Sequence, residues 1–280
     1  MIYHKLKNNF LERLMNVLGK SDNHQLRVLI FHDIEKDKEI FFYELIQNLQ
    51  KNWNIISPRE FKDNINGKIS SNKKRNILLT FDDGYKSQKI ITEKYLDPFN
   101  IKALFFIVSE FVKIKDIKES QNFIKKNFYD DQFNGKLDEA ATNMKKQDII
   151  DLIQKGHTIG CHTKTHMKLS QQKNINILKD EIIQSAKEIQ SDLEGYEIED
   201  FAYTYGDFKS INKISTKIIL DNYNYLYSGL RGNNYNIKSN IIRRDAINLN
   251  EKIEVADAYL NGYVDFLYKN KIKKLETWSK

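Results

Sequence analysis

Two groups of polar residues in this 280-residue chain have types and spacing suited to binding a metal ion. Asp82 and Asp83 follow the apolar run NILLTF, and His162 and His166 enclose the segment HTKTH. Residues four apart project from one face of a helix, so a helical turn would let both imidazoles share one ion. Zinc-type ions accept two imidazoles and a carboxylate while keeping a position for water, and either Asp82 or Asp83 could supply that carboxylate.

Each group also has an ordinary structural explanation. An Asp-Asp-Gly sequence is most often a turn or a helix cap, and a histidine pair is more often solvated than bound to metal. The paired aspartates nevertheless suit a divided role of ligand and base, because consecutive side chains at a strand end point in different directions. Gly84 permits a tight turn beside them.

Apolar runs typical of buried parallel strands precede all of these residues. They alternate with segments of helical periodicity, which predicts an α/β fold whose polar strand ends meet at one face. The first run delivers His32 and Asp33 to that face, and a later run ends in AYTYGD. We expect strands at residues 27–31, 55–56, 76–81, 103–108, 157–161, 200–205, 225–228 and 240–247, and helices at 41–49, 86–95, 147–155, 175–193 and 215–221.

Together, the motifs TFDDG, HTKTH after GHTIGC, and FAYTYGD resemble those of the polysaccharide deacetylase family, the NodB-type carbohydrate esterases of family 4. The resemblance covers residues 27–248 and includes the opening strand with FHDI and the ISPREF segment. It implies a distorted (β/α) barrel of the NodB type with about seven strands.

The resemblance also implies a role for each matched residue. Asp83, His162 and His166 correspond to the ligands of a divalent metal, with zinc expected, and Asp82 to the general base that deprotonates the metal-bound water. Tyr205 corresponds to the residue whose backbone N–H holds the oxyanion. The implied reaction removes an N-acyl group, with acetyl expected, from an amino sugar in a polysaccharide, a glycolipid or a sugar intermediate.

The chain departs from the family pattern in its third motif and in its general acid. Thr204 stands where relatives usually have proline, and Ala202 where many have an arginine that pairs with the base. Arg244 is the candidate replacement, with an ordinary exposed arginine as its alternative. Many relatives use a late histidine as general acid, but no histidine follows His166 here. His32 is therefore the candidate acid, with a purely structural role as its alternative.

The chain divides into a catalytic domain with an extension at each end. We expect an N-terminal extension at residues 1–25, the catalytic domain at 26–250 with 113–142 as an insertion or long loop, and a helical C-terminal extension at 251–280. Within residues 1–20, apolar side chains recur every four residues among basic ones, which predicts an amphipathic helix. That helix either packs on the domain or makes peripheral contact with an anionic membrane near a lipid-linked substrate.

Cysteine content and hydropathy bear on the compartment. Cys161 is the only cysteine, which rules out an intrachain disulfide. Strand alternation would turn it away from the face that His162 uses, so we expect a buried thiol rather than a ligand or nucleophile. Because no apolar run could span a bilayer and the N-terminus lacks a secretory signal pattern, we expect a cytoplasmic protein.

The charge distribution limits the partners. A formal charge of +7 and a pI near 9.1 favour anionic partners in general, but the lysines are spread along the chain without stacking aromatics, so nucleic-acid binding is not expected. We expect an N-acylated sugar or glycan as the partner, in the synthesis of a surface glycan. Two alternatives stay open: a deformylase of a lipid-linked formamido sugar, and a glycan-binding protein that kept the fold but lost catalysis.

Overall fold

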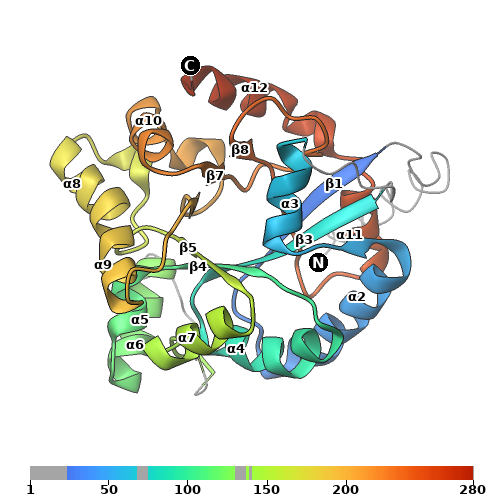
Figure 1. The fold of residues 1–280 in the computed structure, drawn as a ribbon, viewed down its shortest axis with the longest axis horizontal. Helices are drawn as coiled ribbons and strands as arrows, with labels where there is room; N and C mark the ends of the chain where they lie inside the picture. Colours follow the sequence, from blue (N-terminus) through green and yellow to red (C-terminus); the bar gives the residue numbers. More distant parts are fainter. Residues whose placement is uncertain (1–23, 68–74, 130–136, 139–140, 280) are drawn as a thin grey trace.

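The computed structural model describes residues 24–67, 75–129, 137–138 and 141–279, and its centre is a curled, parallel β-sheet (Figure 1). The strands follow the order β8-β7-β6-β5-β4-β3-β1-β9, and β2 pairs with β3 outside that path. The strands are β1 (Gln25–Phe31), β2 (Asn54–Ile55), β3 (Arg75–Asp83), β4 (Leu104–Ile107), β5 (Thr158–Cys161), β6 (Asp200–Ala202), β7 (Tyr225–Tyr227), β8 (Ile241–Ile242) and β9 (Asp245–Ala246).

The architecture is the distorted (β/α) barrel that the resemblance implies, but the strand count differs. The described residues form nine strands rather than about seven. The strand predicted at 240–247 is in fact two short strands, β8 and β9, because the backbone leaves the extended pairing at Arg243 and Arg244. The strand predicted at 200–205 ends at Ala202, and its last residues form the loop of the third motif.

One short segment of the chain links the two ends of the strand order. β8 pairs with β7 and β9 pairs with β1, so the two strands stand at opposite ends of the strand order. The chain passes between these ends within residues 243–244, a point that we call the seam. Arg244 lies on the seam, and its backbone N–H donates to the carbonyl of Leu230 at 3.1 Å.

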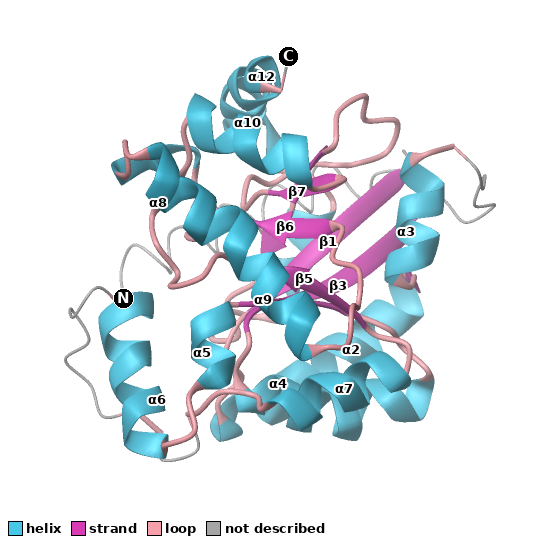
Figure 2. Ribbon diagram, turned by 60° about the vertical axis from the view of Figure 1, so that its left-hand side comes forward, coloured by secondary structure: helices cyan, strands magenta, loops and turns pink. Residues whose placement is uncertain are grey.

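Helices pack around the sheet, as expected when strands alternate with helical segments (Figure 2). The α-helices are α2 (Glu39–Asn52), α3 (Pro58–Ile65), α4 (Lys86–Ile91), α5 (Ser109–Lys113), α6 (Ile117–Phe123), α7 (Lys146–Gln154), α8 (Ile175–Lys179), α9 (Ser185–Asp192), α10 (Lys213–Asn222), α11 (Ile253–Leu260) and α12 (Lys269–Trp278). Turns of π-helix are η2 (Thr92–Leu96), η4 (Ile124–Phe128) and η6 (Asp180–Gln184). The 3₁₀ turns are η1 (Lys36–Lys38), η3 (Asp97–Phe99), η5 (Leu169–Gln171), η7 (Phe208–Ser210) and η8 (Asp265–Leu267).

Local sequence explains where several helices begin and end. The hydroxyl of Ser57 accepts the N–H of Glu60 at 3.3 Å, and Pro58 occupies the first position of α3. Asn212 caps α10 through its side-chain oxygen, which accepts the N–H of Ser215 at 2.9 Å. Gly156 follows α7 with a φ of 88°, which lets the chain turn at once into β5.

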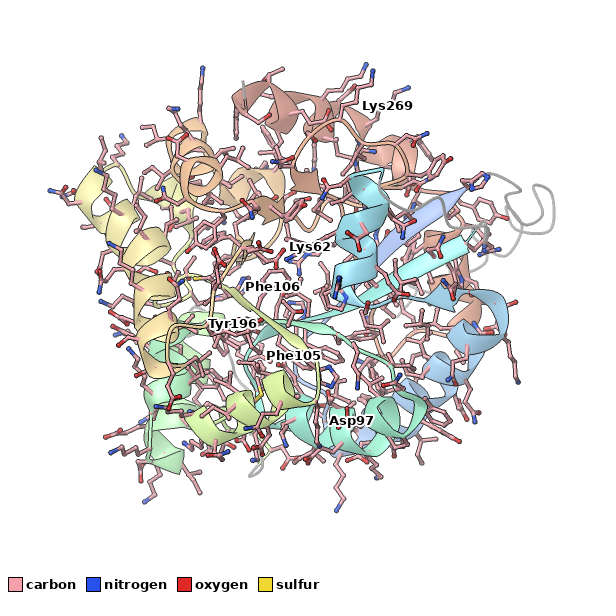
Figure 3. The ribbon with its side chains drawn as sticks, viewed as in Figure 1. Lys62, Asp97, Phe105, Phe106, Tyr196 and Lys269 are labelled. Atoms are coloured by element: carbon pink, nitrogen blue, oxygen red, sulfur yellow. The ribbon has the colours of Figure 1, made fainter. Side chains whose placement is uncertain are left out.

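Alternation along the strands separates an outer core from the barrel interior. In β4, Phe105 belongs to the core between sheet and helices, whereas Phe106 belongs to the interior cluster (Figure 3). A Cβ at Gly160 would lie 2.6 Å from the ring of Phe106, so this glycine makes room for the ring. The same inward positions continue along the strands to Asp82 and His162, at the C-terminal face of the barrel.

The C-terminal helices are anchored to the seam by a buried arginine. In Arg27 of β1, Nη2 lies 2.7 Å from Oδ1 of Asp245 in β9, and Nη1 lies 2.7 Å from Oδ2 of Asp265 in η8. The side chains of Arg27 and Asp245 are fully buried. Within residues 251–279, expected as a helical extension, Asp265 is thus tied to β1 through Arg27, while α12 packs on α10 and η7.

Two other expected segments fall partly or wholly outside the described residues. The segment 113–142, expected as an insertion or long loop, is largely helical where it is described, in α6 and η4. The amphipathic helix expected within residues 1–20, and its membrane contact, lie outside the described residues. Among the residues that are described, we find no helix with both the length and the apolar character needed to cross a bilayer.

Candidate active site

Asp82 and Asp83 end strand β3 at the C-terminal face of the barrel. Asp82 occupies an inward position, as regular strand alternation requires. Asp83 would point outward by the same rule, but its φ of 82° takes it out of extended backbone, and Gly84 follows with a φ of 96°. These two residues turn the chain so that both carboxylates line the same cavity.

Arg244 reaches Asp82 from the seam through two parallel hydrogen bonds. Its Nη1 and Nη2 atoms lie 2.7 and 2.9 Å from Oδ1 and Oδ2 of Asp82. The arginine is buried rather than exposed, and its Nε also donates to the carbonyl of Ser228 at 3.0 Å. Burial alone would raise the pKa of Asp82, but the guanidinium of Arg244 outweighs it and holds this pKa below its ordinary value. Asp82 is therefore ionised at neutral pH.

The two histidines come from an irregular loop after β5, and not from a helical turn, which was one way for their spacing to bring the rings together. Thr163 and His166 both have left-handed backbone, with φ values of 67° and 66°. The hydroxyl oxygen of Thr163 accepts the N–H of His166 at 3.0 Å, and the carbonyl of Thr163 accepts from the N–H of Ser109 at 3.2 Å. Contacts with neighbouring elements thus replace the hydrogen bonds of a helix, and the two rings still meet with centroids 5.3 Å apart.

A backbone carbonyl fixes each imidazole. Nδ1 of His162 lies 2.7 Å from the carbonyl oxygen of Ala202, and Nδ1 of His166 lies 2.9 Å from that of Asn127. A carbonyl only accepts, so Nδ1 carries the proton and Nε2 presents its lone pair. Burial lowers the pKa of His162 to about 4 and that of His166 to about 3, so both rings are neutral at pH 7.

The carboxylate of Asp83 faces the Nε2 lone pairs of His162 and His166. Its Oδ1 lies 3.5 Å from Nε2 of His162 and 3.5 Å from Nε2 of His166, and all three residues are buried. This oxygen has no hydrogen-bond partner among the described residues. Burial and the neighbouring charge of Asp82 raise the pKa of Asp83 well above its ordinary value.

The three ligand atoms, all within 4.8 Å of one another, fit a divalent cation. A buried carboxylate oxygen that faces two lone pairs is unfavourable without a positive charge between them. One carboxylate and two imidazoles also match the ligand set of catalytic zinc sites, in which the fourth position is left for water. Asp83, His162 and His166 therefore form a candidate metal centre.

One cavity of about 470 Å³ brings the sequence-predicted residues together at the C-terminal face. Its wall also includes Phe128 and Tyr129, which come from the segment expected as an insertion. The predicted residues that line it are His32, Asp82, Asp83, His162, His166, Tyr205 and Arg244.

His32 and Tyr205 lie in the wall of this cavity, but their proposed roles stay predictions. The surrounding protein lowers the pKa of His32, so its ring is neutral at rest and holds no proton in reserve for a general acid. Tyr205 has left-handed backbone with a φ of 61°, and its ring centroid lies 4.9 Å from that of His166. The third motif therefore turns sharply beside the second ligand.

Several supporting contacts could not be found from sequence. The carbonyls of Ala202 and Asn127 leave no sequence signal, because every residue carries one. Thr204, at the position where relatives usually have proline, donates its hydroxyl to the carbonyl of Met167 at 2.7 Å and so ties the third motif to the histidine loop. The ring of Phe128 lies 4.8 Å from that of His166, which gives residues 113–142 a direct place at the site.

Known proteins similar to this chain identify a family and a fold. A family profile described as polysaccharide deacetylase matches residues 70–220, just over half of the chain. No curated protein matches the chain. Similar solved structures include IcaB from Ammonifex degensii, with 18% identity and a TM-score of 0.67, covering 86% of this chain and 98% of that chain. The deacetylase PplD from Streptococcus pyogenes in complex with acetate has 16% identity and a TM-score of 0.63, covering 82% of this chain and 95% of that chain. Another is the BpsB deacetylase domain from Bordetella bronchiseptica, with 19% identity and a TM-score of 0.61, covering 81% of this chain and 97% of that chain. At these identities the structural likeness concerns the fold alone.

Proposed function

Because the chain belongs to the polysaccharide deacetylase family, we propose that it removes an N-acyl group, in the first place acetyl, from an amino sugar by metal-dependent hydrolysis. The observation that carries the proposal is the buried triangle of Asp83, His162 and His166 beside a base that a buried arginine keeps ionised. Burying such charges costs about several kcal/mol per ion. A surface that only binds sugar would not need buried charges. Their presence therefore favours catalysis over binding alone.

We infer that the cation is zinc or a similar divalent ion. Such an ion supplies Lewis acidity, which polarises the substrate's amide carbonyl and makes a water more acidic. The chain's own part is to keep the Nδ1 protons of His162 and His166 on the carbonyls of Ala202 and Asn127, so that both Nε2 lone pairs face Asp83.

Asp82 is the proposed general base. Its lowered pKa keeps the carboxylate in its basic form throughout the neutral range. Arg244 occupies one side of each oxygen, but a carboxylate offers about four lone-pair directions, so positions for a water proton remain. Oδ2 of Asp82 lies 4.0 Å from Nε2 of His162, and this closeness to the candidate ligands supports the assignment.

Two further groups would complete the reaction. The backbone N–H of Tyr205 is the candidate for stabilising the oxyanion that forms on attack. The leaving amine needs a proton, and His32 is the candidate donor, since it lines the cavity outside the ligand triangle. Because its lowered pKa leaves His32 neutral at rest, the proton that it delivers would be one that Asp82 has first taken from water.

The cavity and the relatives support an N-acetylated sugar as substrate. The rings of Phe128, Tyr129 and Tyr205 line the wall and offer apolar faces to a sugar ring. The solved relatives include two that are described as deacetylases, one of them in complex with acetate. We therefore place acetyl first and formyl second as the acyl group.

Metal analysis coupled to acyl release tests the proposal. Purified wild type should bind close to one zinc and release acetate from at least one member of a panel of N-acetylated sugars and oligosaccharides, with N-formylated analogues in parallel. Asp83→Ala and His162→Ala should lose both metal and turnover. A wild-type protein that binds zinc but hydrolyses no member of the panel would favour the glycan-binding alternative.

The base assignment needs a variant that separates metal from turnover. Asp82→Asn should keep the metal and lower kcat by about 10²–10⁴-fold, the usual contribution of general acid–base catalysis. Asp207→Asn is the control, because Asp207 follows β6 outside the cavity wall, is half exposed and pairs with Lys271. Asp82→Asn with wild-type kcat would show that another group is the base. An unchanged rate and pH profile for His32→Ala would remove His32 as proton donor.

A further inference from the structure

The loop that carries the histidines must satisfy backbone groups that no regular element pairs. His162 still belongs to the sheet edge, since its N–H donates to the carbonyl of Ile107 at 2.9 Å. Beyond it, left-handed residues break the strand, and each buried N–H then needs an individual acceptor. Thr163 supplies the acceptor for the N–H of His166. The N–H groups of Lys164 and Thr165 remain to be paired.

Glu181 pairs both of them with one carboxylate. Its Oε2 accepts the N–H of Lys164 at 3.1 Å and the N–H of Thr165 at 3.0 Å. Its Oε1 accepts the hydroxyl of Thr165 at 2.7 Å. All three donors lie between the two histidines in sequence, so one side chain holds two of the three residues that separate the candidate ligands.

The setting of Glu181 is unusual for an acidic residue. It is only 3% exposed. Burial raises the pKa of Glu181, and the three donors from the loop act against that rise. Three hydrogen bonds to one buried carboxylate are charge-assisted and stronger than neutral ones. A buried glutamate with this geometry is costly unless the loop holds its present shape.

A π-turn brings Glu181 to the loop. Residues 175–192 form one continuous helical stretch in which the turn η6 interrupts the α-helical pattern, and Glu181 lies within that turn. Such turns widen the helix locally and occur frequently at functional sites. The next residue back, Asp180, is half exposed and contacts only the side chain of Lys164 among the loop residues, at 3.2 Å. The helix therefore offers two neighbouring carboxylates, and only that of Glu181 accepts hydrogen bonds from the loop backbone.

We propose that Glu181 is a positioning residue that fixes the backbone between His162 and His166 and thereby sets the affinity of the metal site. This proposal rests on the proposed function only in that it takes the ligand triangle to bind a divalent cation. Glu181 touches neither the ligands' rings nor the cavity wall, so it acts through the loop alone. Its effect is to order the loop before an ion binds, so that metal binding does not bear the entropic cost of that ordering.

Glu181→Gln tests the proposal with little change in shape. The amide keeps one oxygen as acceptor but replaces the other by a donor that would oppose the loop N–H groups. Zinc affinity, measured by competition with a chromophoric chelator, should fall by about 10–100-fold, the range seen when groups that orient metal ligands are removed. The absorption spectrum of the cobalt-substituted protein should change in shape, because it reports ligand geometry. Asp180→Asn is the matched control and should retain wild-type affinity and spectrum.

A second measurement needs no metal. In the metal-free protein, hydrogen exchange of the amides of Lys164 and Thr165 should be at least about tenfold faster in Glu181→Gln than in wild type, since these amides lose their acceptor. Thr165→Val removes only the hydroxyl contact and should give a smaller loss of zinc affinity, not additive with that of Glu181→Gln. Wild-type zinc affinity and wild-type amide exchange in Glu181→Gln would overturn the proposal. A wild-type protein that binds no zinc would instead overturn the proposed function, so the two failures are distinct.

Discussion

The two sides of the candidate site are built in different ways. On the carboxylate side, Asp82 occupies a regular inward position of a long buried strand, and Arg244 meets it inside the barrel. On the imidazole side, His166 lies in a loop with left-handed backbone, held by Glu181 and by the carbonyl of Asn127, which come from helices outside the sheet. The base is thus fixed by the sheet, whereas the ligand His166 is fixed by the helices packed around the sheet.

This difference separates two kinds of consequence. Breaking the Asp82–Arg244 pair disturbs a buried ion pair in the barrel interior, so it should lower the free energy of unfolding even without metal. Changes on the imidazole side remove neutral rings or reshape a loop, so they should act mainly on metal affinity. The three predictions that follow test this separation.

Arg244→Met should have the largest effect on stability. It leaves the carboxylate of Asp82 buried without its partner, and breaking a buried ion pair in this way costs about 3–5 kcal/mol in the free energy of unfolding. Urea unfolding of the metal-free protein measures the loss. Arg243→Met is the matched control, since its partly exposed guanidinium pairs with Glu276 at 3.0 Å, and a pair of that kind is worth about 1 kcal/mol or less. Similar losses for the two variants would contradict the comparison.

Asp83→Asn should stabilise the metal-free protein while abolishing zinc binding. The buried carboxylate of Asp83 lies beside Asp82 and has an unpaired oxygen, so the neutral amide should raise the free energy of unfolding by about 1–2 kcal/mol. Calorimetry should record a Tm higher by about 2–4 °C for each kcal/mol. A lower Tm for metal-free Asp83→Asn would show that Asp83 is satisfied without a cation.

Acid should weaken the metal-free protein through the two imidazoles. Their pKa values of about 4 and 3 in the folded state lie below the ordinary 6.5, so the unfolded state binds protons first as the pH falls. The stability that the neutral rings contribute is complete above pH 6.5. It is lost as the pH falls from 6.5 toward 4, by about 1 kcal/mol per histidine for each pH unit. Urea unfolding at pH 7, 6 and 5 should show a shallower dependence for His166→Gln, and equal slopes would contradict this assignment.

The sequence was sufficient where regular geometry rules. Apolar runs located the strands, and alternation turned Cys161 away from the face of His162, into the outer core where it is buried. The spacing of His162 and His166 left the shape of their loop open, and the structure has no helical turn there, because the loop backbone is bonded to Ser109 and Glu181 instead. The break between β8 and β9 was missed for the same reason, since nothing in the residue types marks where a chain must cross from one sheet edge to another. Arg244 was a candidate only because relatives have an arginine that this chain lacks at Ala202.

The seam links the position of Arg244 to the packing of the C-terminal helices. The two residues that carry the chain across the gap include the arginine that keeps Asp82 ionised, and the next residue, Asp245, is gripped by Arg27 and through it by the C-terminal helices. If those helices separated from β1, Asp245 would lose part of the support that Arg27 gives it, and we expect the neighbouring Arg244 to move away from the carboxylate of Asp82. With Asp82 as the proposed base, turnover should then stop while most strands are still paired, so we expect activity to be lost before the chain unfolds.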